Sequence, residues 1–209
     1  MNYLHPTRLA NLLGNAETAA KQGSKPYPYV LIFEDDGIRV AGIGQHLMVE
    51  DYEPGNPGSG AVAITHDEAK EAAKAIRGAP NAGKKDTEVS VSLDGDIFRV
   101  AAGDEVFVEI ADLGDEADDA WELRLKAQEL YESPRERADR LTMYDVTILT
   151  KLGQLKPGDG SKTVTLWPSF AADTTVWELG SVRGFIEGNR GTTAPEVSES
   201  EPSGILPGL

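Results

Sequence analysis

The residues that could do chemistry are two groups of carboxylates, each placed between short apolar runs. Glu34-Asp35-Asp36 stands before Gly37, and Asp94 and Asp96 stand on either side of Gly95. Neighbouring carboxylates are ligands that divalent cations accept, so a metal-dependent enzyme is one hypothesis. The Asp-Gly dipeptide is also typical of tight β-hairpin turns. We therefore favour hairpin turns over a metal site, and we expect neither a bound metal nor another cofactor.

The other residue types that support catalysis are scattered along the chain. His5, His46 and His66 are too far apart in sequence to suggest a metal site. The Gly-rich stretch 55–60 lacks the Gly-Lys-Ser/Thr of a phosphate-binding loop, and the chain has neither a Gly-x-Ser-x-Gly elbow nor any cysteine. The sequence therefore predicts a protein that is not an enzyme.

Composition limits the class of protein. The chain has 209 residues, of which 40% are hydrophobic, which is enough for one large domain or two smaller ones. It has no basic and apolar leader at its start and no long apolar run, so we expect a soluble cytoplasmic protein. A formal net charge of -15 argues against a surface that binds nucleic acid all round, but it leaves room for a local basic face.

Residues 27–113 repeat one pattern, in which a strand enters an acidic turn and returns as a strand. Helices are expected over 6–22 and 67–77, because apolar residues recur there at helical spacing. Pro6 suits the first turn of the first helix, and Thr65 or Asp67 can cap the second. The strands expected in this part cover residues 29–34, 38–43, 47–52, 61–64, 89–102 and 105–110.

An acidic stretch divides the chain. Asp104 to Glu122 contains nine acidic residues and no Lys or Arg. Beyond it, helices are expected over 120–141 and 144–153, and strands over 163–168 and 174–186. We interpret the organisation as a first module over 1–113, an acidic linker over 114–119, a second module without an obvious first hairpin over 120–188, and a disordered acidic tail with an apolar end over 189–209.

Basic residues gather on the expected helices. At about 100° per residue, Lys70, Lys74 and Arg77 share one arc of the helix over 67–77, beside a face of alanines. Lys and Arg on such a face can bind DNA phosphates without sequence preference. Ordinary solubilising charge is the alternative and stays open. The candidate DNA-binding residues are Arg8, Lys21, Lys70, Lys74, Arg77, Arg135, Arg137, Arg140 and Lys151.

The last residues carry a different signal. Ile205, Leu206 and Leu209 form a short apolar end on an acidic tether, which is typical of a docking peptide for a partner protein. A tail without a role is the alternative.

The order of these elements resembles a domain of a bacterial-type DNA sliding clamp, the polymerase processivity factor. The stretches that carry the resemblance are 38–46, 58–77, 87–102 and 106–113, followed by 144–152, 163–168 and 176–186. The resemblance implies an α+β fold of two clamp-like modules, each an antiparallel sheet backed by helices, with the second module truncated. It also implies helices that line a central hole and face DNA, with strands outside. A two-domain subunit could close a ring as a trimer, whereas a truncated second module would leave a monomer that cannot encircle DNA. The length fits a shortened, viral version of such a clamp.

Three functions follow as hypotheses. The first is a non-enzymatic processivity factor that binds double-stranded DNA through basic helices, forms a homo-oligomeric ring, and holds a DNA polymerase or another replication protein on the apolar outer surface between its modules. The second is an acidic interaction protein that binds or inhibits a host replication protein through 104–122 or 205–209. The third is the metal-dependent enzyme that uses the hairpin aspartates.

Overall fold

The computed structural model describes residues 1–20, 29–44, 47–132, 146–169 and 174–187. In chain order the elements are β1 (Asn2–Leu4), α1 (Pro6–Ala20), β2 (Tyr29–Glu34), β3 (Gly37–Ile43), β4 (Leu47–Pro54), β5 (Ala61–Thr65), α2 (His66–Arg77), β6 (Val89–Asp94), β7 (Ile97–Ala102), β8 (Glu105–Ala111), η1 (Gly114–Ala117), α3 (Asp118–Glu132), α4 (Val146–Leu152), β9 (Thr165–Ser169), β10 (Thr174–Leu179) and β11 (Val182–Glu187).

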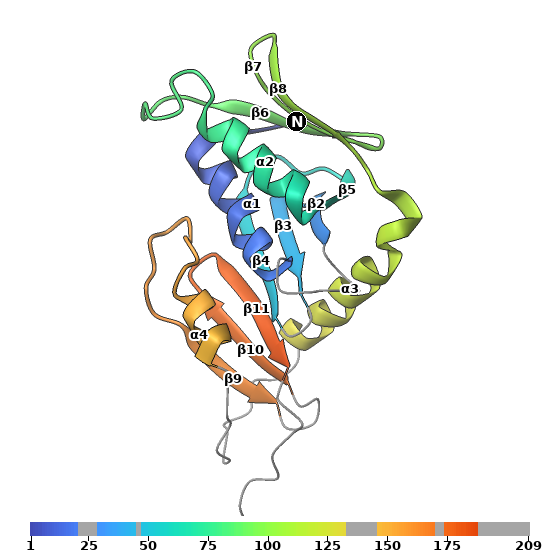
Figure 1. The fold of residues 1–209 in the computed structure, drawn as a ribbon, viewed down its shortest axis with the longest axis vertical. Coiled ribbons are helices and arrows are strands. Elements are labelled where there is room, and N and C mark those ends of the chain that lie inside the picture. Colours follow the sequence, from blue (N-terminus) through green and yellow to red (C-terminus); the bar gives the residue numbers. More distant parts are fainter. Residues whose placement is uncertain (21–28, 45–46, 133–145, 170–173, 188–209) are drawn as a thin grey trace, which may run out of the picture.

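The strands form two antiparallel sheets (Figure 1). One sheet has the order β1-β6-β7-β8, and the other has the order β5-β2-β3-β4-β11-β10-β9. The first ten elements read as two copies of a strand, a helix and three strands, and each copy lends its first strand to the sheet of the other. The predicted α+β class, with antiparallel sheets backed by helices, is confirmed.

The acidic turns form the hairpins that the sequence predicts. Tyr29 lies opposite Ile43 in the β2–β3 pair, and Asp94 lies opposite Ile97 in the β6–β7 pair. Gly95 has φ 61, a left-handed conformation that glycine adopts without a steric penalty. Strand β1 was not predicted, because three residues are too few to show an alternating pattern.

Helix α2 begins with a reciprocal cap. The Thr65 hydroxyl accepts from the Glu68 amide at 3.2 Å, and the Glu68 carboxylate accepts from the Thr65 amide at 2.8 Å. The alanine face and Ile76 are buried, as the helical spacing predicts. The cap therefore fixes where the helix starts and so which side chains point outward.

We expect Thr65→Ala to lower the free energy of unfolding by about 1 kcal/mol, because an amide of the first turn loses its acceptor. Chemical denaturation followed by circular dichroism measures this loss. Thr65→Ser keeps the hydroxyl and should stay close to the parent protein, so an equal loss in both variants would contradict the role of the cap.

Three helices, α1, α2 and α4, pack on one face of the seven-stranded sheet. Alternate residues of β2 point to opposite faces, and Val30 and Ile32 pack with α1 and α2 in one core cluster. Helix α4 packs with β10 and β11, and Ala19 of α1 joins the same cluster. We call α1, α2 and α4 the helix layer (Figure 1).

Helix α3 lies on the opposite face. Leu31 and Phe33, which alternate with the residues under α1, pack against Ala120 and Ala127 of α3. Helix α3 therefore covers Leu31 and Phe33 on the face of the sheet where the sequence predicts an outer apolar surface for partners. Residues 114–119, predicted as a linker, form η1 and the first residues of α3, and their acidic side chains are exposed.

The second part of the chain joins the first through strand pairing. β11 pairs with β4 from Val182 opposite Asp51 to Ile186 opposite Leu47. The stretch 174–186, predicted as strand, is a hairpin of β10 and β11. One sheet thus crosses the proposed boundary between the two modules. No helix in the described part of the chain is long and apolar enough to span a membrane.

Candidate nucleic-acid interface

The cations of α2 lie on its outer arc. Lys70, Lys74 and Arg77 are exposed, while the alanine face beside them is buried. The Arg77 guanidinium donates from Nη2 to the Ala10 carbonyl of α1 at 3.1 Å, which fixes it across the two helices. Lys74 forms an exposed ion pair with Glu71 at 3.6 Å. An exposed pair of this kind is weak, so Lys74 remains able to exchange Glu71 for a phosphate.

A polar pocket of about 270 Å³ opens between α1, α2 and the segment that follows α4. Three cations and one carboxylate line it, so its own charge balance is positive in a strongly acidic protein. Amide and hydroxyl groups complete the wall, and these can donate to an anion. The charged lining residues are Lys70, Arg77, Lys156 and Glu17, and the polar ones are Asn11, Asn15, Thr18 and Gln154.

Asn15 brings Lys156 to this pocket. Its buried side chain accepts from the Lys156 amide at 2.8 Å and donates to the Lys156 carbonyl at 3.1 Å. The same Nδ2 donates to Asp51 at 2.8 Å. Lys156 was absent from the predicted interface, and only its position just after a helix could have suggested it. The contact with α1 joins residues 141 positions apart.

The other predicted DNA contacts have different outcomes. Lys151 lies in the last turn of α4, within the helix layer. Lys21, Arg135, Arg137 and Arg140 lie outside the described residues, as do Ile205, Leu206 and Leu209 of the predicted docking peptide. Their roles stay predictions.

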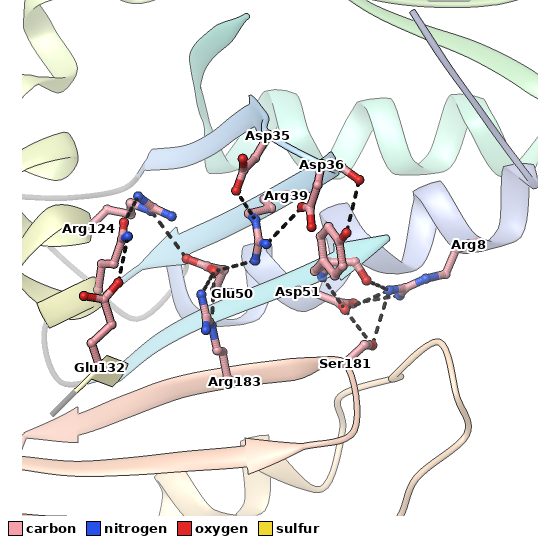
Figure 2. Close-up of polar contacts among 12 residues, drawn as sticks. Arg8, Asp35, Asp36, Arg39, Glu50, Asp51, Arg124, Glu132, Ser181 and Arg183 are labelled. Carbon is pink, nitrogen blue, oxygen red and sulfur yellow. Dashed lines mark hydrogen bonds and ion pairs between the residues drawn. The ribbon is translucent and has the colours of Figure 1, made fainter. Parts of the chain in front are cut away.

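Arg8 is held in the interior junction between α1, β4 and the β10–β11 turn (Figure 2). Its Nη1 and Nη2 each donate to Asp51 at 2.8 Å, and Nε donates to Glu53 at 2.6 Å. Burial lowers the pKa of Arg8, but the hydrogen bonds and charges of Asp51 and Glu53 outweigh it and hold the pKa above its ordinary value. Since these donors are engaged, we leave Arg8 out of the interface.

A second buried carboxylate lies beside the first, on the opposite face of β4 (Figure 2). Glu50 accepts from Arg183 at 2.6 Å and forms ion pairs with Arg39 and Arg124 at 3.5 Å. Arg183 also stacks on the Tyr131 ring at 4.2 Å. Burial, with the charge of Glu50, raises the pKa of Tyr131 and keeps its hydroxyl neutral. These contacts hold α3, β4 and β11 together.

Two of the aspartates considered for metal binding, Asp35 and Asp36, contact an arginine of the same cluster, whereas Asp94 and Asp96 lie at the β6–β7 hairpin of the other sheet. Asp35 and Asp36 form ion pairs with Arg39 at 3.4 and 3.1 Å. Within the ranges that the structure describes, no group of three His, Asp or Glu side chains could hold a metal ion.

Solved structures with a similar architecture include bacterial DNA polymerase sliding clamps. The DnaN sliding clamp of Bartonella birtlesii is 14% identical with a TM-score of 0.65, over 97% of this chain and 68% of that one. The sliding clamp of Pseudomonas aeruginosa is 12% identical with a TM-score of 0.66, over 90% of this chain and 65% of that one. The clamp of Bacillus subtilis is 12% identical with a TM-score of 0.59, over 96% of this chain and 67% of that one.

These likenesses show the sliding-clamp fold, as the sequence resemblance predicted. The chain spans about two thirds of the length of the clamps that it matches. No protein-family model and no curated protein matches the sequence.

Proposed function

We propose that this chain is a non-enzymatic, clamp-like processivity factor that tethers a DNA polymerase to double-stranded DNA. The helix layer faces the phosphate backbone, and Lys70, Lys74, Arg77 and Lys156 contact it. The observation that carries the proposal is the pocket between α1, α2 and the segment after α4, where cations from two distant parts of an acidic chain converge.

Charge explains how such a layer would hold DNA and still slide. Each phosphate contact made by Lys or Arg releases a condensed counterion, and this gain does not depend on the base sequence. The rest of the acidic surface repels the duplex and confines it to the helix layer. Exposed side chains such as Lys70 and Lys74 can pass from one phosphate to the next without a large barrier.

The tether requires partners. We infer a polymerase or another replication protein as the cargo, and a ring-shaped assembly that surrounds the duplex. From the sequence we expect that ring to be homo-oligomeric and of viral origin, with Ile205, Leu206 and Leu209 available to a partner protein.

A double substitution tests the tether. Lys70→Glu/Lys74→Glu removes two candidate phosphate contacts, so the slope of log affinity against log salt should fall by about 1.8, at about 0.9 per contact. Retention of the protein on circular DNA should fall by at least about tenfold at moderate salt. The matched control is Lys84→Glu/Lys85→Glu, which makes the same charge change on an exposed loop beyond the helix layer. If both double variants lose the same retention on circular DNA, the helix layer is not the surface that binds DNA.

The acidic face favours a second candidate function. Asp115, Glu116, Asp118 and Asp119 are all exposed on η1 and the start of α3. An acidic interaction protein that inhibits a host replication protein would use this face. If this is the function, the wild-type chain is not retained on circular DNA. Neither Lys70→Glu/Lys74→Glu nor Lys84→Glu/Lys85→Glu should then change the retained amount.

A further inference from the structure

A groove of about 500 Å³ lies between the end of α4, the segment that follows it and the end of β10. Its lining is mainly apolar. Leu152, Leu155 and Leu179 line it and belong to one buried core cluster. Val164 also lines it, is half-buried and packs against the same cluster. An apolar lining of this kind is typical of a binding groove.

Hydrogen bonds hold the wall of this groove in place. The Lys156 amide donates to the Asn15 side chain at 2.8 Å, which ties the segment after α4 to α1. The Gly158 amide donates to the Ser181 hydroxyl at 3.1 Å, which ties the same segment to the β10–β11 turn. A wall fixed in this way has little conformational freedom left to lose when a ligand binds, so the groove is preorganised.

The charge of the groove favours an acidic ligand. Lys156 and Lys162 line it, and both are exposed. Among the residues that the structure describes, no carboxylate lines the groove. A ligand that buries apolar side chains against the leucines and brings carboxylates to the two amines would complement both properties of the groove. The groove therefore fits a short apolar peptide that has acidic residues beside it.

The chain itself carries a segment of this composition, outside the described residues. Residues 191–209 contain three glutamates and no Lys or Arg. Ile205, Leu206 and Leu209 follow these glutamates closely in the sequence and supply the apolar side chains. Residues 191–209 thus combine the two properties that the groove requires. The three glutamates are Glu196, Glu199 and Glu201.

The apolar segment can reach the groove of its own chain. Leu179, which lines the groove, lies opposite Val182 at the start of β11, and β11 ends at Glu187. At about 3.3 Å per residue, Glu187 lies about 17 Å from Val182. The stretch 188–204 spans up to about 55 Å when extended, which exceeds that separation. Such a tether gives an effective concentration on the order of mM, so the segment of the same chain binds in preference to that of a free copy at micromolar concentration.

We propose that the groove beside α4 binds residues 205–209 of the same chain, with the glutamates before them against Lys156 and Lys162. Docking needs neither DNA nor a partner protein, so it holds or fails separately from the proposed tether. Lys156 lines both this groove and the pocket between α1 and α2, so the docked carboxylates compete there with DNA phosphates. This competition, unlike the docking, rests on the proposed function.

Zero-length cross-linking tests the docking in the unchanged full-length protein. A carbodiimide joins a lysine amine to a carboxylate that touches it, and mass spectrometry identifies the joined pair. We expect cross-links from the glutamates of 191–209 to Lys156 and Lys162. Lys84 and Lys85 are exposed on a loop beyond the helix layer and serve as internal controls. They should be joined to these glutamates at least tenfold less often.

A variant of the apolar segment separates docking from charge attraction. Ile205→Ser/Leu206→Ser/Leu209→Ser keeps every lysine and every carboxylate of the chain. Because the apolar contacts are lost, the cross-links to Lys156 and Lys162 should fall at least tenfold. Circular dichroism establishes that the variant is folded.

A variant of the groove tests the other side of the contact. Val164→Ser replaces a half-buried apolar side chain of the lining and should lower the same cross-links at least threefold. Val106→Ser makes the same change at a position of β8 that is 48% exposed and lies outside the groove, so it should keep the yield of the parent protein.

Three results would overturn the proposal. Equal yields at Lys84, Lys85, Lys156 and Lys162 would mean that the glutamates meet the lysines at random. An unchanged yield in the triple serine variant would mean that charge alone brings the segment to the groove. In a mixture of isotope-labelled and unlabelled protein, cross-linked pairs that combine both forms would assign the groove to the segment of a second copy.

Circular duplex DNA tests the competition for Lys156. In a protein that retains the DNA, the cross-links to Lys156 should fall at least tenfold when DNA is in excess. An unchanged yield on retained DNA would contradict the competition, whereas a protein that does not retain DNA would contradict the proposed tether. The cross-links formed without DNA decide the docking in either case.

Discussion

Asp51→Ala is expected to lower the free energy of unfolding by about 3–5 kcal/mol, because it leaves the Arg8 guanidinium buried without its main counter-charge. The Asp51 side chain has no exposed surface, and that of Arg8 is only 11% exposed. Asp51 also accepts from Asn15 at 2.8 Å and from the Ser181 hydroxyl at 2.9 Å. One substitution therefore breaks contacts from α1 and from the β10–β11 turn together. Urea denaturation measures the loss.

Two companion variants separate the buried charge from general damage. Glu53→Gln removes the more exposed partner of Arg8 and should cost only about 0–1 kcal/mol. Adding Arg8→Met to Asp51→Ala should recover part of the lost stability, because the unpaired cation is then gone. A double variant that is less stable than Asp51→Ala alone would contradict this account of the junction.

The local features of the fold could be predicted from the sequence, because each depends on residues close along the chain. The Asp-Gly turn at Gly95 and the buried alanine face of α2 follow from turn chemistry and helical spacing. The exposed arc of Lys70, Lys74 and Arg77 follows from the same spacing. These features place the cations of α2, but they do not show that Lys156 lies beside them.

The junction could not be predicted in this way, because its partners are far apart in sequence. Arg8 meets Asp51 at a separation of 43 residues and Ser181 at a separation of 173. A cation on a helix face looks the same in a sequence whether it meets solvent, a phosphate or a buried aspartate. The helical position of Arg8 therefore predicts a DNA contact, while the sequence does not place Lys156 beside the cations of α2. A DNA contact by either residue stays a prediction. The positions of Arg8 and Lys156 depend on contacts of α1 with β4 and with the segment after α4, which no short sequence motif indicates.

Gly42→Ala is expected to cost about 1–3 kcal/mol, although it adds a single methyl group, because α1 crosses β3 directly over this residue. A Cβ at Gly42 would lie 2.8 Å from Cα of Ala16 and still closer to the Ala16 carbonyl. These are backbone atoms, which no change of rotamer can move away. The whole of α1 would have to shift, and with it Asn15, which holds Lys156 at the pocket. The same variant should therefore also weaken retention on circular DNA.

The matched control for Gly42→Ala is Gly83→Ala. Gly83 has nothing within 4 Å of the position that a Cβ would occupy, so the added methyl group meets no atom there. Replacing such a glycine restricts the unfolded chain and should leave stability unchanged or raise it by up to about 1 kcal/mol. If thermal melts show Gly42→Ala to be as stable as Gly83→Ala, then α1 can move away from β3 at little cost. The position of the basic pocket would then not depend on the close approach of this helix to the sheet.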